Sequence, residues 1–90
     1  MLYTVEYTQQ AIDDLAELPK VIARRIDKKL NWFIVQEQPL IFAKHLNNFS
    51  CGHYRFRVGD YRVLFDVDKK GTISILMILR IKRRKEVYDI

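Results

Sequence analysis

The sequence has 90 residues, enough for one small domain with its own core, and we expect a single domain over residues 1–90. Its formal net charge is +5, from sixteen Lys and Arg against eleven Asp and Glu. One cysteine, no signal peptide and no apolar run of about twenty residues argue against a disulfide-stabilised secreted protein and an integral membrane protein. These properties fit a cytoplasmic location.

The first half of the chain predicts a strand followed by two helices. Alternating aromatic and β-branched residues over residues 2–7 indicate the strand, and Thr8 is a candidate N-cap for the first helix, which Pro19 ends. An apolar stripe over residues 21–34 then predicts an amphipathic second helix that ends before Pro39. Trp32, on this second helix, is expected to belong to the core.

Three strands follow, at residues 54–58, 61–67 and 72–81. Gly59-Asp60 predicts a two-residue hairpin turn, and Lys69-Lys70-Gly71 predicts a three-residue loop with Gly71 in the left-handed conformation. The fold class is therefore α+β, with an N-terminal strand and a helical hairpin packed on a twisted antiparallel sheet.

The turns also predict which residues face each other. The first turn places Arg57 opposite Arg62, and the second places Tyr61 opposite Leu79. Arg80 and Lys82 then share a face with Arg55, Arg57 and Arg62, and so do three apolar residues: Leu64, Leu76 and Ile78.

Two directly opposed arginines repel each other, so their presence needs an explanation. Asp60 or Asp66 is near enough in sequence to neutralise the pair. The other interpretation is a concave cationic face that holds phosphate. The charge distribution favours a polyanionic partner, because residues 1–18 contain four acidic and no basic residues, whereas residues 80–90 contain five basic residues.

Two segments carry a resemblance to a known family. GDYRVLFDV at residues 59–67, followed by ISILMILRIKRRKEVY at residues 73–88, resembles the RelE/ParE superfamily of small toxins from toxin–antitoxin operons. The resemblance covers essentially the whole chain. Its most specific part is Tyr-Arg in the middle strand together with Arg-Lys-Glu-Val-Tyr at the end.

RelE-like members cleave messenger RNA on the ribosome, and ParE-like members inhibit DNA gyrase. The resemblance favours a ribosome-dependent endoribonuclease without metal or other cofactor, in which an RNA 2′-hydroxyl attacks the adjacent phosphate. It also implies three partners: the ribosome, messenger RNA and an acidic, RelB-like antitoxin in a hetero-oligomer. A ParE-like gyrase inhibitor and a degenerate member that only binds its antitoxin are the alternatives.

The resemblance assigns catalytic roles to Arg62, Lys82, Arg84 and Tyr88, and RNA or phosphate binding to Arg55, Arg57, Arg80 and Arg83. Arginines suit a reaction that develops charge on phosphate, and nearby basic residues favour the phenolate of Tyr88 as a general base. Some relatives have Gly-His-Arg where this chain has Lys82-Arg83-Arg84, so the proton donor to the leaving oxygen stays open. Alternatively, the Tyr88 ring simply packs against the sheet.

Two further expectations concern ligands and partners. Cys51 and His53 have Cys-x-His spacing, but His45 is the one further candidate ligand, so we expect no zinc site. Because two residues follow Tyr88, the antitoxin is expected to cover the cationic face or block access to the ribosome rather than displace a long terminal helix. It would dock on Leu64, Leu76 and Ile78 or on the exposed flank of the helices.

Overall fold

A computed structural model describes residues 2–46 and 53–85, and it confirms the predicted α+β fold. The elements in chain order are β1 (Leu2–Tyr7), α1 (Gln9–Ala16), α2 (Lys20–Ile34), the 3-10 helix η1 (Pro39–Phe42), β2 (Lys44–His45), β3 (Tyr54–Val58), β4 (Tyr61–Lys70) and β5 (Ile73–Arg83). The strands form one sheet in the order β1-β5-β4-β3-β2. β1 runs parallel to β5, and the other neighbours are antiparallel.

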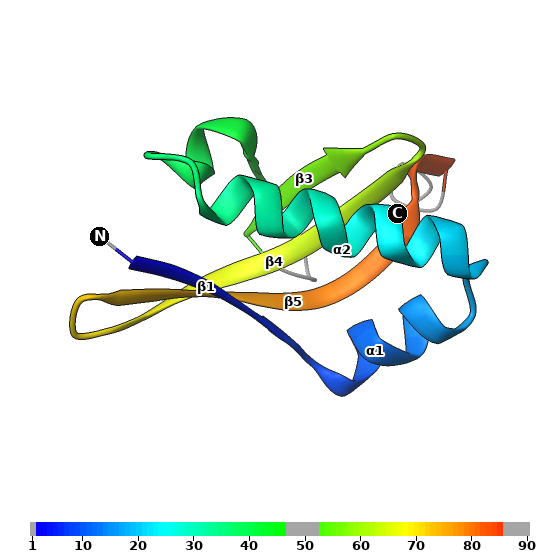
Figure 1. Ribbon diagram of the computed structural model, residues 1–90, viewed down its shortest axis with the longest axis horizontal. Coiled ribbons are helices and arrows are strands. Elements are labelled where there is room, and N and C mark those ends of the chain that lie inside the picture. The colour runs from blue at the N-terminus through cyan, green and yellow to red at the C-terminus, as the bar shows by residue number, and fades with distance from the viewer. Residues whose placement is uncertain (1, 47–52, 86–90) are drawn as a thin grey trace.

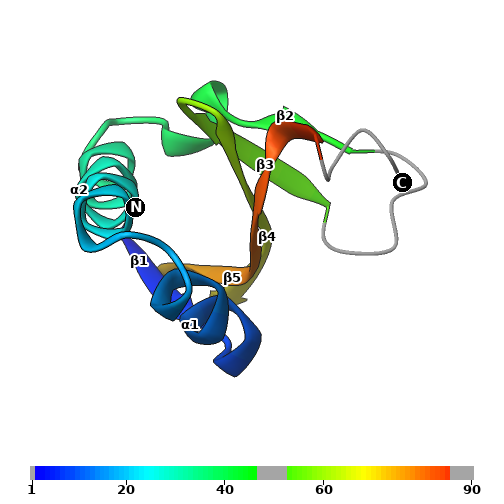
Figure 2. The ribbon, with the colours of Figure 1, turned by 90° about the vertical axis from the view of Figure 1, so that its right-hand side faces the viewer.

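The two helices occupy different places on this sheet. Figures 1 and 2 show α2 lying across one face, whereas α1 lies beside the C-terminal half of β5. α1 begins as the sequence predicts, because the Thr8 hydroxyl accepts a hydrogen bond from the Ala11 N–H at 3.3 Å. Pro19 then separates the helices and stands at the N-cap position of α2.

The core lies between α2 and the facing side of the sheet. α2 buries Ile26, Leu30 and Phe33, and the Phe33 ring stacks on Phe56 of β3 with centroids 4.1 Å apart. Phe56 in turn stacks on Phe65 of β4 at 4.5 Å. This face therefore consists of apolar residues from every second position of β3 and β4.

Trp32 does not belong to this core, so the expectation for it was wrong. Its side chain is 44 % exposed and lies edge-on to Phe33 and Phe42, with the ring centroids 5.5 and 5.3 Å away. Phe33, the next residue on α2, points to the sheet instead. One step along a helix turns a side chain by about 100°, so Trp32 falls on the margin of the apolar stripe.

The first hairpin has the predicted register. Tyr54 faces Phe65, Phe56 faces Val63, and Arg57 faces Arg62. The chain turns through Gly59 and Asp60, and Gly59 has a φ of 58°, which suits the first position of a two-residue hairpin loop.

The second hairpin has a different register from the prediction. Lys70 pairs with Ile73, so the loop consists of Gly71 and Thr72, and Tyr61 faces Arg83 rather than Leu79. Gly71 does adopt the predicted left-handed conformation, with a φ of 61°. The predicted three-residue loop was wrong because a glycine with positive φ equally suits a tighter two-residue turn.

A β-bulge in β5 divides this hairpin into two parts. Phe65 pairs with Ile78 but Leu64 pairs with Arg80, which leaves Leu79 as the extra residue. Before the bulge, Leu76 and Ile78 face the core and are fully buried there, so their assignment to the cationic face was wrong. After the bulge, Arg80 and Lys82 turn to the opposite side, as predicted. We call this opposite side, which carries Arg57, Arg62 and Lys82, the outer face.

Candidate functional site

Basic residues on the outer face form two rows that run across the strands. In the first row, Arg57, Arg62 and Lys82 are direct neighbours on β3, β4 and β5. In the second row, Lys44, Arg55, Leu64 and Arg80 are neighbours from β2 to β5. Adjacent strands are about 4.8 Å apart, so each row concentrates positive charge along a short line.

The members of the first row differ in their exposure. Arg57 is exposed, Lys82 is half-buried, and the Arg62 side chain is 1 % exposed. The Arg62 Nη1 donates hydrogen bonds to the carbonyl oxygens of Gly59 and Tyr61, both at 3.0 Å. Arg62 thus stabilises the turn between β3 and β4, and it is the buried charge of this row.

These hydrogen bonds also explain how Arg57 and Arg62 can face each other. The carbonyl oxygens of Gly59 and Tyr61 accept hydrogen bonds from Arg62, so part of its charge is offset within the turn. Asp66, one of the two predicted neutralising carboxylates, instead accepts hydrogen bonds from His53.

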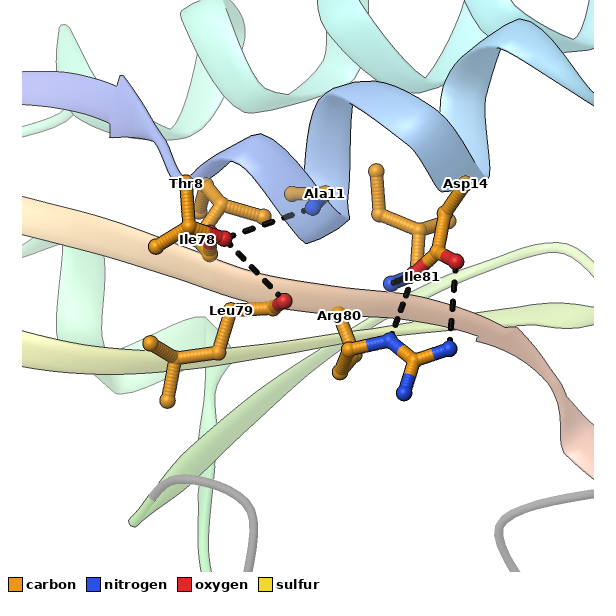
Figure 3. Close-up of polar contacts among 7 residues, drawn as sticks. All are labelled: Thr8, Ala11, Asp14, Ile78, Leu79, Arg80 and Ile81. Atoms are coloured by element: carbon orange, nitrogen blue, oxygen red, sulfur yellow. Dashed lines mark hydrogen bonds and ion pairs between the residues drawn. The ribbon is translucent and has the colours of Figure 1, made fainter.

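Arg80 of the second row is paired with a helix. Its Nε lies 2.9 Å from Asp14 Oδ2 and its Nη2 lies 3.2 Å from Asp14 Oδ1, which is a bidentate ion pair between β5 and α1 (Figure 3). Asp14 Oδ2 also accepts the Ile81 N–H at 2.9 Å. The Arg80 side chain is therefore held by an ion pair within the fold. Asp14 fixes its position, and the sequence alone did not identify Asp14 as part of the site.

The same edge of β5 is also bound by Thr8. Its hydroxyl lies 2.8 Å from the Ile78 carbonyl oxygen and 3.2 Å from that of Leu79 (Figure 3). β1 stops pairing with β5 at Ile78, so Thr8 and Asp14 bind the backbone of β5 where the strand partner ends. The bulge at Leu79 lies at this point.

The electrostatics of Asp14 follow from this arrangement. Burial alone would raise the pKa of its carboxyl, but hydrogen bonds from Arg80 and the Ile81 N–H, with the charges of Arg80 and Lys82, hold this pKa below its ordinary value. Asp14 is thus a carboxylate at neutral pH and keeps the pair charged.

The basic residues at the end of β5 are divided between the faces. Lys82 is on the outer face beside Arg62, whereas the preceding and following positions point the other way, and Arg83 is paired with Tyr61. Arg83 and Arg84 are exposed, and the Arg84 N–H donates to the Asp60 carbonyl oxygen at 2.7 Å. Of these three side chains, Lys82 is therefore the one that the strand register brings to the first row. Tyr88 and Cys51 lie outside the described residues.

Two clefts adjoin the rows. One, of about 310 Å³, lies between α1 and the end of the β4–β5 hairpin and is lined by Asp14, Glu17, Leu18, Tyr61, Arg80, Ile81 and Arg83. The other, of about 370 Å³, lies between α2 and the edge of β3 and is lined by Arg25, Lys28, Lys29, Trp32, Arg57, Val58 and Gly59. Arg57 contributes to both the first row and the second cleft, so positive charge continues from the outer face around the sheet edge to α2.

The described residues hold neither a metal-ligand cluster nor a membrane-spanning helix. Within residues 2–46 and 53–85, no three His, Cys, Asp or Glu side chains are grouped as metal ligands would be. No helix in the described part of the chain is long and apolar enough to cross a membrane.

A mixed five-stranded sheet with α2 on one face and two basic rows on the other defines a small basic α+β protein. Residues 5–88 match the family model described as the ParE toxin of type II toxin–antitoxin systems, parDE. The chain belongs to this family, and so to the RelE/ParE superfamily of toxins.

Individual relatives agree with this assignment. Toxin RelG of Mycobacterium tuberculosis (strain ATCC 25618 / H37Rv) is 32% identical over 89 residues, which cover 98% of both chains. The RelBE2 toxin–antitoxin complex of M. tuberculosis contains a chain with 30% identity and a TM-score of 0.69, matched over 93% of this chain and 100% of that one. A RelE–RelB complex from Pyrococcus horikoshii OT3 gives 29% identity and a TM-score of 0.65, over 93% and 97% of the chains.

Proposed function

We propose that this toxin is a ribosome-dependent endoribonuclease that cleaves messenger RNA and thereby stops translation. The observation that carries the proposal is the alignment of Arg57, Arg62 and Lys82 in one row across three strands. The accessible charges of Arg57 and Lys82, with the buried charge of Arg62 between them, attract an anionic ligand to this row. A messenger RNA phosphate is an anion of suitable size and charge.

The proposed reaction uses the RNA itself as nucleophile. A 2′-hydroxyl attacks the adjacent phosphorus, the bond from phosphorus to the 5′-oxygen breaks, and the products are a 2′,3′-cyclic phosphate and a 5′-hydroxyl. Arg55, Arg57 and Lys82 would stabilise the extra negative charge on the phosphate. Tyr88 is proposed as the base that accepts the 2′-hydroxyl proton. The chemistry supplied by these side chains needs no metal.

We infer that a cognate antitoxin, acidic and RelB-like, binds the toxin in a hetero-oligomer. Two solved relatives, those from M. tuberculosis and P. horikoshii, are toxin–antitoxin complexes. Charge complementarity supports an acidic partner on the outer face, where Arg57 is exposed and Lys82 half-exposed. Leu64 is fully buried, as are Leu76 and Ile78, so the apolar contacts of the antitoxin must come from elsewhere.

A ParE-like gyrase inhibitor is the second candidate function. The family model that matches residues 5–88 is that of ParE toxins, and this is the observation in its favour. In that case the exposed Arg83, Arg84 and Lys85 at the end of the described chain would bind an acidic protein surface. A member that binds only its antitoxin would use the same surface without either activity.

Induction of the toxin without antitoxin separates these candidates. Pulse labelling of protein and DNA synthesis gives the order of inhibition, and primer extension on cellular messages locates cleavage. We expect protein synthesis to fall first, with new 5′ ends inside translated messages. Failure of DNA synthesis first, with double-strand breaks, would favour gyrase inhibition, and arrest of neither process would favour the inactive member.

A further inference from the structure

His53 and Asp66 form a hydrogen-bonded pair on the outer face. The His53 Nδ1 lies 2.7 Å from Asp66 Oδ1, and the same oxygen accepts the His53 backbone N–H at 2.8 Å. The two side chains are 69 % and 39 % exposed, so a ligand on this face can reach them. Two bonds to a single carboxylate oxygen hold both the backbone and the ring of His53 in place.

The pair lies in line with the basic rows. Position 53 immediately precedes β3, which begins with Tyr54 opposite Phe65, and its hydrogen bonds go to the side chain of Asp66, the next residue along β4. Arg55 and Arg57 lie on the outer side of β3, about 7 Å apart, and the bond to Asp66 brings His53 to the same side, two residues before Arg55. His53 is therefore next to Arg55, one of the residues proposed to stabilise the phosphate.

We propose that His53 is the general acid of the cleavage reaction, and that Asp66 is its positioning residue; this inference rests on the proposed endoribonuclease activity. An ionised carboxylate can only accept hydrogen bonds, so Nδ1 is the protonated nitrogen in the pair. The other ring nitrogen, Nε2, is then the one that can donate to a ligand. In the imidazolium form, Nε2 carries a proton that it can give away.

Tyr88, His53 and water account for every proton that moves in the step. As the 2′-oxygen bonds to phosphorus, its proton passes to the base, the role proposed for Tyr88. As the bond from phosphorus to the 5′-oxygen breaks, His53 Nε2 gives its proton to that oxygen. The imidazole is then neutral, with Nδ1–H still bound to Asp66, and water restores both groups to their starting forms.

A histidine suits this role better than the basic residues of the rows. An arginine stays protonated at any physiological pH, so it stabilises charge well but is a poor proton donor. Imidazole groups change protonation between about pH 5 and 8, where the enzyme must work. The charged groups on the same face are Glu6 of β1, Lys44 of β2, Arg55 and Arg57 of β3, Arg62, Asp66, Asp68 and Lys70 of β4, and Arg80 and Lys82 of β5.

The chain offers a matched control for this histidine. His45, on β2, is also exposed, but it is the register partner of Tyr54 and lies edge-on to that ring at 5.1 Å. It therefore belongs to the opposite side of the sheet from His53. His45→Asn and His53→Asn make the same chemical change, and the side-chain amide that the second substitution introduces can still donate to Asp66.

Single-turnover cleavage of a message on programmed ribosomes tests the proposal. We expect H53N to be slower by roughly two to four orders of magnitude, the range of general acid–base contributions, and H45N to equal the wild type. The wild-type rate should fall as pH rises through the range where imidazole loses its proton. H53N should lack this fall, and Asp66→Ala should cleave more slowly than the wild type because it removes the acceptor that holds the backbone and the ring of His53.

A message with a bridging 5′-sulfur at the cleaved bond separates acid catalysis from a structural role, since a thiolate departs without a proton. H53N and the wild type should cleave this substrate at equal rates. If H53N cleaves the normal message as fast as the wild type, or remains equally impaired on the sulfur substrate, the assignment of His53 is overturned while the nuclease proposal stands. A wild-type protein that leaves both messages intact overturns both proposals.

Discussion

Asp14 and Arg80 are 66 positions apart in sequence and form a bidentate ion pair, with Nε to Oδ2 at 2.9 Å and Nη2 to Oδ1 at 3.2 Å. The pair joins α1 to β5 immediately after the bulge at Leu79. Because Asp14 also accepts the Ile81 N–H, one carboxylate holds both the side chain and the backbone of the strand that carries Lys82. The geometry of the outer face therefore depends on the first helix.

Replacing Asp14 should destabilise the fold. We expect D14N to lower the free energy of unfolding by about 1.5–3 kcal/mol, because it weakens charge-assisted hydrogen bonds in a side chain that is 15 % exposed. Asp13→Asn is the matched control, since the exposed Asp13 is bonded to Gln9 of its own helix. Urea denaturation measures both variants, and equal midpoints for D13N and D14N would contradict this view of the ion pair.

The contribution of Asp14 should also depend on pH. Its pKa is lower in the folded state than the ordinary value of 3.8, so the stabilisation is present above that value and is lost as pH falls through the lowered pKa. The difference in unfolding free energy between wild type and D14N should thus shrink in acid. Denaturation curves at pH 6, 4 and 2 measure it, and a difference independent of pH would show that the charge of Asp14 does not contribute.

Arg57 and Arg62 face each other but should respond differently to substitution by lysine. Arg62→Lys should lower the unfolding free energy by about 1–3 kcal/mol, because an ammonium group cannot reproduce the guanidinium bonds to Gly59 and Tyr61. Arg57→Lys should leave stability unchanged and slow cleavage on the ribosome. Denaturation and cleavage assays of both variants test this, and the reverse pattern would exchange the roles of the two arginines.

Tyr88 is predicted to act as a base, so Tyr88→Phe should lower cleavage by roughly two to four orders of magnitude with little change in ribosome binding. The substitution keeps the ring and removes only the ionisable hydroxyl. Single-turnover rates and a ribosome sedimentation assay provide the two measurements. Cleavage at the wild-type rate would instead support the packing role of the ring.

Antitoxin association should slow as salt is added, because opposite charges steer the encounter and salt screens them. Salt should slow association less for Arg57→Gln, which removes an exposed charge of the first row, than for Arg24→Gln, which removes an exposed charge of α2. Stopped-flow association rates from 50 to 500 mM salt measure the dependence. An association rate that does not change with salt concentration would indicate that the antitoxin binds away from the basic rows.

Local sequence determined most of the elements of this protein. Thr8 and Pro19 mark the helix boundaries through capping and the missing N–H of proline, and both act on their immediate neighbours. Gly59 and Asp60 similarly determine the register of the first hairpin, which places Arg57 opposite Arg62. These features depend on interactions a few residues long, so the sequence reveals them directly.

The bulge at Leu79 was decided only by the tertiary structure. Residues 75–79 are all apolar, so alternation cannot show which of them face the core, and a shift of register leaves the hydropathy pattern unchanged. Thr8 and Asp14 bind the edge of β5 on either side of Leu79, where β1 ends, and these contacts stabilise the bulge at that position. The pairs Asp14–Arg80 and His53–Asp66 likewise join segments that meet only when the sheet has formed, because their geometry depends on the packing of separate elements.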